Sequence, residues 1–213
     1  MARPYSRSYD LADEDTNGYV AAATGATTPL TLITTSVGDG VARKVTVTSA
    51  ANLAAITFTV TGTDADGVAQ TEAITGPGAT TVTGSKFFLT VTEVAISATL
   101  GANEADVGWA DEFVTPTYPI NWRASEASVS IVRTGTINWT LRQTFDELAP
   151  SATYPAGPSS ATLTWSSSTD TGVVGVTTSA ITNYDKPATA LQLLGNSYST
   201  GAELAWQIVQ ADM

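Results

Sequence analysis

The sequence predicts an all-β protein with two β-sandwich or jelly-roll-like units and an extended N-terminal arm. In many short stretches apolar residues alternate with Thr, which is the two-residue period of a half-buried strand. Turn-forming Gly, Pro, Asn and Asp separate these stretches at a spacing typical of sandwiches and barrels. No stretch has a convincing helical period. The predicted boundaries are 1–28 for the arm, 29–105 for the first unit, 106–125 for a linker or rim, and 126–213 for the second unit.

Residues 1–28 are predicted to be an arm because their apolar residues follow neither the two-residue period of a strand nor the 3.6-residue period of a helix. The segment carries four side chains suited to an interface, Arg3, Tyr5, Arg7 and Tyr9, followed by acidic and then small residues. A loose terminus is one interpretation, since chain ends are often poorly ordered. The other is an arm that binds a neighbouring subunit, because Arg and Tyr are frequent interface anchors. The four residues are therefore candidate partner contacts.

The first unit is predicted from period-two stretches and one strong turn. Apolar residues alternate with polar ones over 44–48 and 56–61, and Asp64-Ala65-Asp66-Gly67 follows as a turn signal. Residues 55–75 therefore form a predicted β-hairpin. Shorter strands are expected at 80–83, 87–92 and 94–100, with a turn at Gly84-Ser85.

The second unit follows an acidic segment that ends in two prolines, residues 101–119, which is why a linker is expected there. The clearest alternation places Ile137, Trp139 and Leu141 on one face of a strand. After a loop rich in Pro, Gly and Ser, the closing strands are expected at 190–194 and 204–209.

The composition excludes several functional classes. Among 213 residues, 20 are acidic and 9 basic, which gives a formal charge of -11 and argues against a nucleic-acid or anionic membrane partner. The chain has neither Cys nor His, so it cannot build a disulfide, a thiolate nucleophile or a Ser-His-Asp triad. No apolar run approaches the ~20 residues of a membrane-spanning helix. We expect no catalytic residues, no cofactor and no metal site.

Two acidic motifs have structural explanations that we favour. The sequence from Asp64 resembles the start of a calcium loop, but an EF-hand needs Glu at the twelfth position and Thr75 stands there. Asp106, Asp111 and Glu112 could supply carboxylates for glycoside hydrolysis. Because neighbouring residues of a strand face opposite sides, Asp111 and Glu112 are a poor pair, and an acidic rim is the better explanation.

Ser85-Lys86 is the one close Ser and Lys pair. A Ser-Lys dyad needs a buried lysine with a lowered pKa. Here Lys86 stands between Ser85 and Phe87 at the predicted start of a strand in water, so we favour a structural role.

The five tryptophans fall into two groups. Trp139, Trp165 and Trp206 are in phase with Ile or Leu on their strands, so they are predicted to be core residues. Trp109 and Trp122 lie in the predicted linker region and are candidate partner contacts. With Tyr118 they could also form a platform for stacking sugars.

Three segments of the sequence resemble a pattern seen in tailed-bacteriophage virion proteins. The first covers residues 56–77, the second has Thr81-Val82-Thr83-Gly84-Ser85-Lys86-Phe87-Phe88 followed by residues 91–94, and the third covers 137–146 with Pro187-Ala188 before a late strand. The resemblance extends over 44–100 and 128–209. It implies a multi-copy structural component of a phage particle, and it offers no catalytic residues.

The function expected from this resemblance is a non-enzymatic capsid decoration or cement protein in the virion. It would bind the major capsid protein or other virion proteins, act as a homo-oligomer, and bind neither nucleic acid nor membrane. A tail or head–tail connector component is the first alternative. A carbohydrate-binding module that uses Trp109, Trp122 and Tyr118 is the second, and a hydrolase with carboxylate catalysis at Glu112 is the third.

Overall fold

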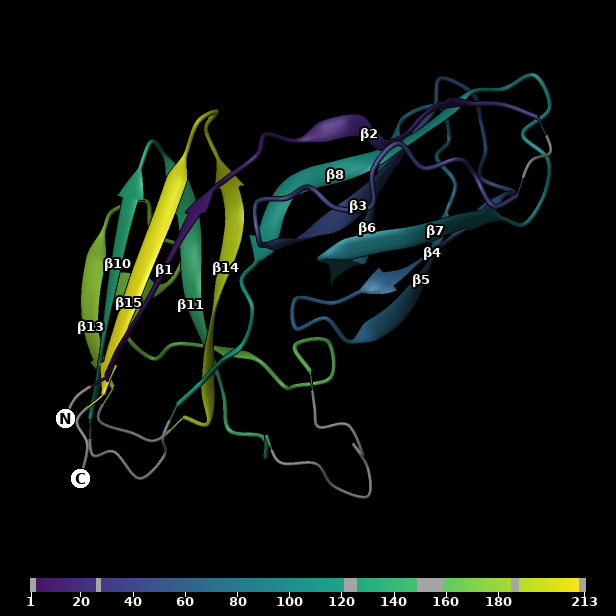
Figure 1. The fold of residues 1–213 in the computed structure, drawn as a ribbon. Coiled ribbons are helices and arrows are strands. Elements are labelled where there is room, and N and C mark those ends of the chain that lie inside the picture. Colours follow the sequence, from purple (N-terminus) through teal and green to yellow (C-terminus); the bar gives the residue numbers. More distant parts are fainter. Residues whose placement is uncertain (1–2, 26–27, 121–125, 149–158, 185–187, 211–213) are drawn as a thin grey trace. The chain divides into compact units, whose positions relative to one another are not determined.

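The computed structural model describes residues 3–25, 28–120, 126–148, 159–184 and 188–210 (Figure 1). Over these residues the secondary structure is almost entirely antiparallel β, with a 3-10 turn, η1 (Thr171–Val173), and no α-helix. The predicted all-β class is therefore confirmed. Within the same residues, no helix has the length and apolar character needed to span a membrane.

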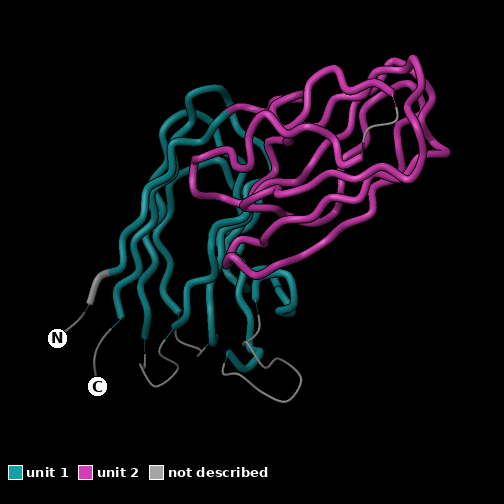
Figure 2. Tube along the Cα trace, turned by 45° about the vertical axis from the view of Figure 1, so that its right-hand side comes forward, with its two compact units in different colours: residues 1–12, 114–213 teal, residues 13–113 magenta. Residues whose placement is uncertain are grey.

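The chain divides into two compact units, shown in different colours in Figure 2. Unit 1 contains residues 1–12 and 114–213, and unit 2 contains residues 13–113. Unit 2 is thus inserted after the first strand of unit 1. This division differs from the expected boundaries at 29–105 and 126–213, because the first twelve residues and the expected linker contribute strands to the units.

Unit 1 contains a four-stranded antiparallel sheet, visible in Figure 1. Its order is β1 (Arg3–Asp10), β15 (Glu203–Gln210), β10 (Ala127–Thr134) and β13 (Ala180–Tyr184). A second group of strands pairs β11 (Ile137–Thr144) with β14 (Ala190–Tyr198), and the two-residue strands β12 (Ser166–Ser167) and β9 (Tyr118–Pro119) pair with β11 and β14. The closing strands predicted from the sequence are confirmed.

The core of unit 1 is rich in aromatic rings. Trp206 of β15 and Trp139 of β11 are completely buried, as predicted. The ring centroid of Trp206 lies 6.0 Å from that of Tyr5 on β1 and 6.1 Å from that of Tyr118 on β9, so these contacts join the two groups of strands. Trp165 is only half-buried, and the Arg142 guanidinium lies 5.3 Å from its ring centroid.

Unit 2 contains two groups of strands. In the first, β8 (Ala105–Val114) pairs with β2 (Asp15–Ala23) and with β3 (Ala42–Thr48), and β3 pairs with β6 (Thr81–Phe88). In the second, β4 (Thr57–Thr63) lies between β5 (Ala69–Thr75) and β7 (Thr90–Ile96). The β4–β5 pair runs from Thr57 opposite Thr75 to Thr63 opposite Ala69, which confirms the predicted hairpin.

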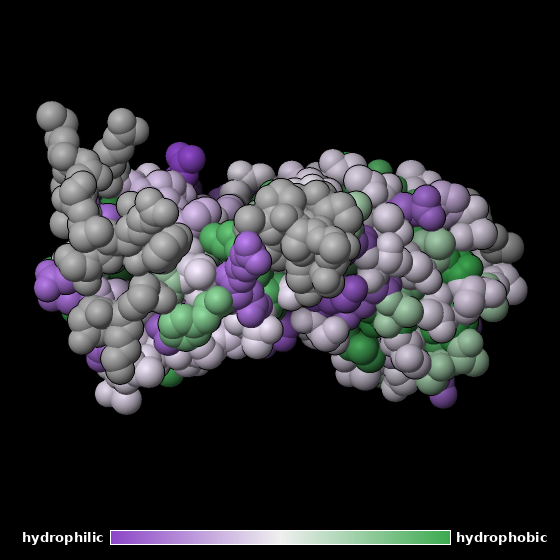
Figure 3. Space-filling view, turned by 90° about the horizontal axis from the view of Figure 1, so that it is seen from below, coloured by the Kyte–Doolittle hydropathy of each residue, from purple (hydrophilic) through white to green (hydrophobic). Residues whose placement is uncertain are grey.

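The core of unit 2 is mainly aliphatic and follows the alternation seen in the sequence. Its fully buried members come from six strands and are Tyr19, Val45, Val47, Phe58, Val60, Phe88, Val91, Val94, Ala105 and Val107. The threonines between the buried residues of β4 are half-exposed. Figure 3 shows one face of the chain, where most described residues have the pale colours of intermediate hydropathy and strongly hydrophilic or hydrophobic residues are scattered.

The expected N-terminal arm is not an arm in this structure. Residues 3–10 form β1 and pair with β15 in an unbroken eight-residue register, and residues 15–23 form β2. Tyr9 and Leu11 are buried, at 6% and 3% exposed. Tyr5 and Tyr9 stand four positions apart on one face of β1, with polar residues between them. Arg7 shares this face with the two tyrosines and interrupts the apolar alternation, so no clear strand period is visible in the sequence here.

Two further expectations differ from the structure. The expected linker, residues 106–125, begins inside the ten-residue strand β8. Val107 and Phe113 of this strand are fully buried, so the segment belongs to the core and is not a linker. The expected turn at Gly84-Ser85 lies inside β6. A Cβ atom on Gly84 would lie 2.6 Å from Oε2 of Glu72, so a larger residue there would require the Glu72 carboxylate to shift.

Candidate functional site

The candidate contacts on β1 are largely internal to unit 1. Tyr9 is buried, and the ring of half-buried Tyr5 packs on Tyr118 with a centroid distance of 4.0 Å. Arg7 is exposed, its Nε donates to Tyr5 Oη at 3.3 Å, and its guanidinium lies 5.5 Å from the Tyr5 ring centroid. Arg3 takes a place on β1 opposite Gln210. Tyr9 is therefore unavailable to a partner, whereas Arg7 and part of Tyr5 lie at the surface.

Burial raises the pKa of two phenols in unit 1. Desolvation raises the pKa of Tyr9 to about 12, and the pKa of Tyr118 is also raised by burial and by the neighbouring Tyr5. These tyrosines therefore act as aromatic packing groups at neutral pH, because their ionised forms are disfavoured.

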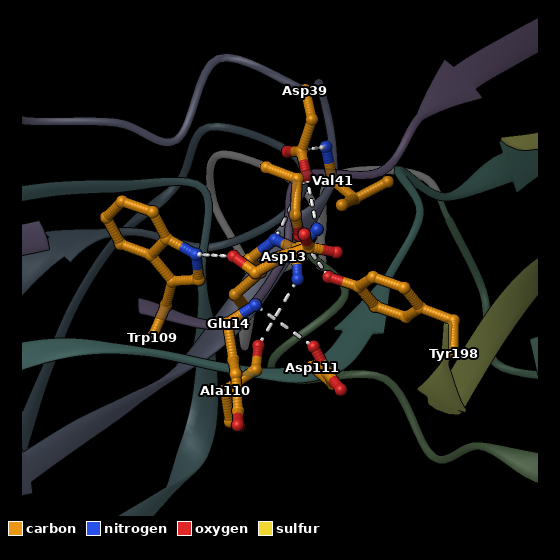
Figure 4. Close-up of polar contacts among 10 residues, drawn as sticks. Asp13, Glu14, Asp39, Val41, Trp109, Ala110, Asp111 and Tyr198 are labelled. Carbon is orange, nitrogen blue, oxygen red and sulfur yellow. Dashed lines mark hydrogen bonds and ion pairs between the residues drawn. The ribbon is translucent and has the colours of Figure 1, made fainter. Parts of the chain in front are cut away.

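Trp109 supports the structure of unit 2 (Figure 4). Its Nε1 donates to the backbone oxygen of Asp13 at 2.8 Å, a bond drawn in Figure 4. Its ring meets Tyr19 edge-on with a centroid distance of 5.1 Å. A Cβ atom on Gly18 would lie 2.1 Å from the Trp109 ring, so the ring lies directly against that backbone. The other predicted contact in this group, Trp122, lies outside the described residues.

Unit 2 also holds a buried ion pair between Arg43 and Asp39, and Figure 4 labels Asp39. Arg43 is fully buried and its Nε donates to Oδ2 of Asp39 at 3.0 Å, while its Nη1 donates to the backbone oxygen of Ala110 at 3.2 Å. The side chain of Asp39 is 3% exposed and also accepts from the amide of Val41. A buried pair whose other polar groups are also hydrogen-bonded is a structural element, so we assign it no binding role.

The acidic residues weighed as catalytic groups make structural contacts. Asp106 and Asp111 accept hydrogen bonds from the backbone amides of Ala22 and Glu14, at 2.7 and 3.1 Å. Glu112 forms an ion pair with Lys44. Among the described residues, no group of three or more Asp or Glu is arranged to hold a metal ion.

The Ser85-Lys86 pair also makes structural contacts. Ser85 Oγ donates to Oε1 of Glu72 at 2.7 Å, and Lys86 Nζ donates to the backbone oxygen of Thr71 at 2.8 Å. The two side chains therefore bond to β5 rather than to each other.

One surface of unit 1 has the character of a contact site, and we call it the outer face. It consists of ten residues on the side of the four-stranded sheet opposite Trp206, and cross-strand register arranges them in three rows. The rows are Ser6, Gln207, Ser130 and Ile181; Ser8, Ala205 and Val132; and Val209, Ser128 and Asn183. All ten residues are exposed or half-exposed, and none is charged.

The outer face exposes three large aliphatic side chains. Val132, Ile181 and Val209 are 56%, 76% and 40% exposed and come from three different strands. Val132 continues an outward series with Ser128 and Ser130, while Val129 and Ile131 between them point to the core. In the sequence, the only sign of this surface is that the apolar and polar alternation ends at Val132, which is apolar although it points outward.

A row of acidic residues borders the outer face. Asp10 of β1 stands directly opposite Glu203 of β15, and both are exposed. They line a depression of about 370 Å³ together with Ser8, Val132 and Ala205. Like charges directly opposite each other destabilise a sheet, so this arrangement favours a cation from outside.

Net charge is divided unequally between the units. By sequence, unit 2 has twelve acidic and three basic residues, a net charge of -9, whereas unit 1 has eight acidic and six basic residues, a net charge of -2. The nearly neutral unit is the one that carries the uncharged outer face.

Neither a model of a known protein family nor a curated protein sequence matches the chain.

Proposed function

We propose that this chain is a non-enzymatic structural protein of a bacteriophage virion and acts as a capsid decoration or cement protein. The sequence resemblance supports the class. The observation that supports a contact role is the outer face, an exposed and uncharged sheet surface on a chain whose net charge is -11. We also infer that each unit is a β-sandwich, because the buried residues alternate along the paired strands.

The energetics favour burial of the outer face against another protein. Covering Val132, Ile181 and Val209 would recover about 25 cal/mol for each Å² of apolar surface removed from water. No charge in the three rows would have to be desolvated, and the cores of protein interfaces are depleted of charged residues in the same way. The serines can bond to a partner through their hydroxyl groups.

The acidic border specifies the partner. Asp10 and Glu203 would be stabilised by a Lys or Arg of the capsid protein that enters the depression between them. We therefore propose a capsid surface that is flat and mainly apolar, with one basic side chain at its edge. The -9 charge of unit 2 favours its exposure to water.

The test introduces charge into the outer face. Ile181→Lys and Val132→Lys place a cation in the proposed contact, and we expect the number of copies per purified particle to fall at least about tenfold. The matched control is Val68→Lys, which makes the same change at an exposed valine of unit 2 and is expected to leave the copy number unchanged. Quantitative mass spectrometry of particles measures both. Equal occupancy for the outer-face variants and the control would refute the proposal.

The tail or connector alternative is distinguished by copy number. Occupancy in the hundreds per particle indicates the capsid, whereas a single ring of subunits indicates the tail or neck. Sedimentation of the purified chain tests self-association through the same face. A homo-oligomer that Ile181→Lys dissociates, together with unchanged particle occupancy, would assign the outer face to a second copy of the chain.

A further inference from the structure

We propose that unit 1 also carries a binding pocket for a neutral saccharide, in which Phe145 stacks on the sugar ring and Asp170 accepts its hydroxyl groups. The pocket has a volume of about 330 Å³. Its walls come from the end of β11, from the segment 166–170 that includes β12, and from residues 182–184 of β13. The proposal does not depend on the virion function or on the outer face.

Phe145 supplies the apolar wall of this pocket. It follows directly after β11 and is 58% exposed. Among the described residues, it is the one phenylalanine whose side chain is largely exposed. A pyranose ring presents C–H groups on one side, and these pack well against the face of an aromatic ring. An exposed aromatic ring that lines a pocket with polar groups is typical of a ligand site.

Asp170 supplies a fixed acceptor. Its Oδ2 accepts from Thr182 Oγ1 at 2.6 Å and its Oδ1 accepts from the amide of Gly172 at 2.8 Å, while its own amide donates to Ser168 Oγ at 3.2 Å. These bonds hold the carboxylate in one orientation. An ionised carboxylate offers about four lone-pair sites, so positions remain for sugar hydroxyl groups. Acceptors held in place before binding lose little entropy when a ligand arrives.

The same contacts favour the ionised form of Asp170. The hydrogen bonds from Thr182 and then from Gly172 lower the pKa of its carboxyl group below its ordinary value. At neutral pH the group is therefore an acceptor only, which suits the hydroxyl donors of a sugar.

Ser167 and Thr169 supply exposed hydroxyl groups on the wall of the pocket. A hydroxyl group both donates and accepts, so these groups can bond to sugar hydroxyl groups that Asp170 does not hold. The side chain of Asn183 is not among these groups, because it lies on the outer face, where its Oδ1 accepts from Ser128 Oγ at 2.8 Å.

The chemistry of the pocket selects against other small ligands. An ionised Asp170 repels phosphate and carboxylate groups, which disfavours nucleotides and organic acids. The volume lies near the lower end of the range for small-molecule sites, which fits one or two sugar rings. The remaining competitor is a cationic side chain, and its binding would be weakened by salt because it depends on charge.

The test is a titration of the ¹⁵N-labelled full chain with D-glucose, D-galactose, N-acetyl-D-glucosamine and L-rhamnose. Concentrations up to about 100 mM cover the millimolar affinity expected of a small open site. We expect at least one sugar to cause saturable shifts of the amides of residues 166–170 and 182–184. We also expect the affinity to be the same in about 1 M NaCl, since the ligand is uncharged.

Variants separate a specific site from an adventitious one. Phe145→Ala is expected to weaken binding about tenfold or more, and Asp170→Asn about fivefold, while the matched control Ile33→Ala, at another exposed apolar residue, has no effect. Thr182→Val tests positioning of Asp170 and should weaken binding while the fold, judged from the remaining amide signals, is retained.

Three results would overturn the proposal. They are the absence of saturable shifts with all four sugars, sugar binding that Phe145→Ala leaves unchanged, and a pocket that responds only to a lysine-rich peptide and loses that response in high salt. The outcome is separable from the proposed function, because Phe145→Ala is expected to leave particle occupancy unaltered.

Discussion

The two units use their charged residues in opposite ways. In unit 2, with its net charge of -9, Asp39, Asp64 and Glu72 are buried and accept hydrogen bonds within the unit. In unit 1, with its net charge of -2, the three rows of the outer face contain no charged residue, and Asp10 and Glu203 stand at their border. The carboxylates of unit 2 therefore form internal hydrogen bonds or face water. In unit 1, the rows of the outer face that we propose to bind a partner contain no charged residue.

The units also differ in what fills their cores. Trp139 and Trp206 are the largest buried side chains of unit 1, whereas unit 2 packs mainly Val, Leu and Ile around Phe58 and Phe88. The stability of unit 1 should therefore depend on a few large rings, and that of unit 2 on many small contacts and on buried polar bonds. Substitutions in each unit and a change of pH test this difference.

Trp206→Ala should destabilise unit 1 by about 3–5 kcal/mol, because it removes a fully buried ring and leaves a cavity beside Tyr5 and Tyr118. Urea unfolding followed by hydrogen exchange of separate peptides measures each unit independently. Unit 2 peptides should keep their protection. An equal loss of amide protection in both units would show that they do not unfold independently, and it would contradict a separate dependence of unit 1 on its large rings.

Arg43→Met should destabilise unit 2 by about 3 kcal/mol. Met fills much of the volume of the side chain but leaves Asp39 buried without its partner. The control is Lys44→Met, which removes a partly exposed ion pair with Glu112 and should cost less than about 1 kcal/mol. The same unfolding measurement compares the two variants, and similar losses for both would contradict a special role for the buried pair.

Glu72→Ala should destabilise unit 2 by about 1–3 kcal/mol, because the amides of Ser85 and Lys86 lose their acceptor. Glu93→Ala, at an exposed position on β7, is the matched control and should change stability by less than about 0.5 kcal/mol. Faster amide exchange confined to β6 would support the prediction. No change at Ser85 and Lys86 would contradict it.

Unit 1 should lose stability as the pH rises from 10 to 12. The pKa of Tyr9 is raised by burial to about 12, so its contribution is fully present below the unfolded value of 10 and is lost as the pH passes through the folded value. The loss should be about 2 kcal/mol. Tyr9→Phe should flatten this dependence for unit 1 peptides, and an unchanged pH profile in that variant would assign the loss to other groups.

The sequence predicted the parts of the fold that depend on local patterns. The hairpin at β4 and β5 followed from alternating threonines and from Asp64, whose carboxylate accepts the amides of Asp66 and Val68 as a turn residue should. Trp139 and Trp206 were correctly placed in a core because each is in phase with Ile or Leu.

The parts that were missed depend on pairing between distant segments. β1 pairs with β15 from the other end of the chain, and no local pattern shows which strand will cover Tyr9. The acidic residues of β8 suggested a linker because their partners, the amides of Ala22 and Glu14, are more than 80 positions away. The outer face and the pocket at Phe145 likewise join strands far apart in sequence, so neither was visible before the structure.

The most direct test of the central claim maps which surface touches the particle. Because the chain has no cysteine, Gln207→Cys places a single thiol at the middle of the outer face, and Val68→Cys places one on unit 2 as the control. Each is coupled to a short photo-crosslinker, added to particles that lack the protein, irradiated and analysed by mass spectrometry. The account predicts crosslinks to the capsid protein from position 207 and none from position 68. Crosslinks from position 68 alone would contradict it.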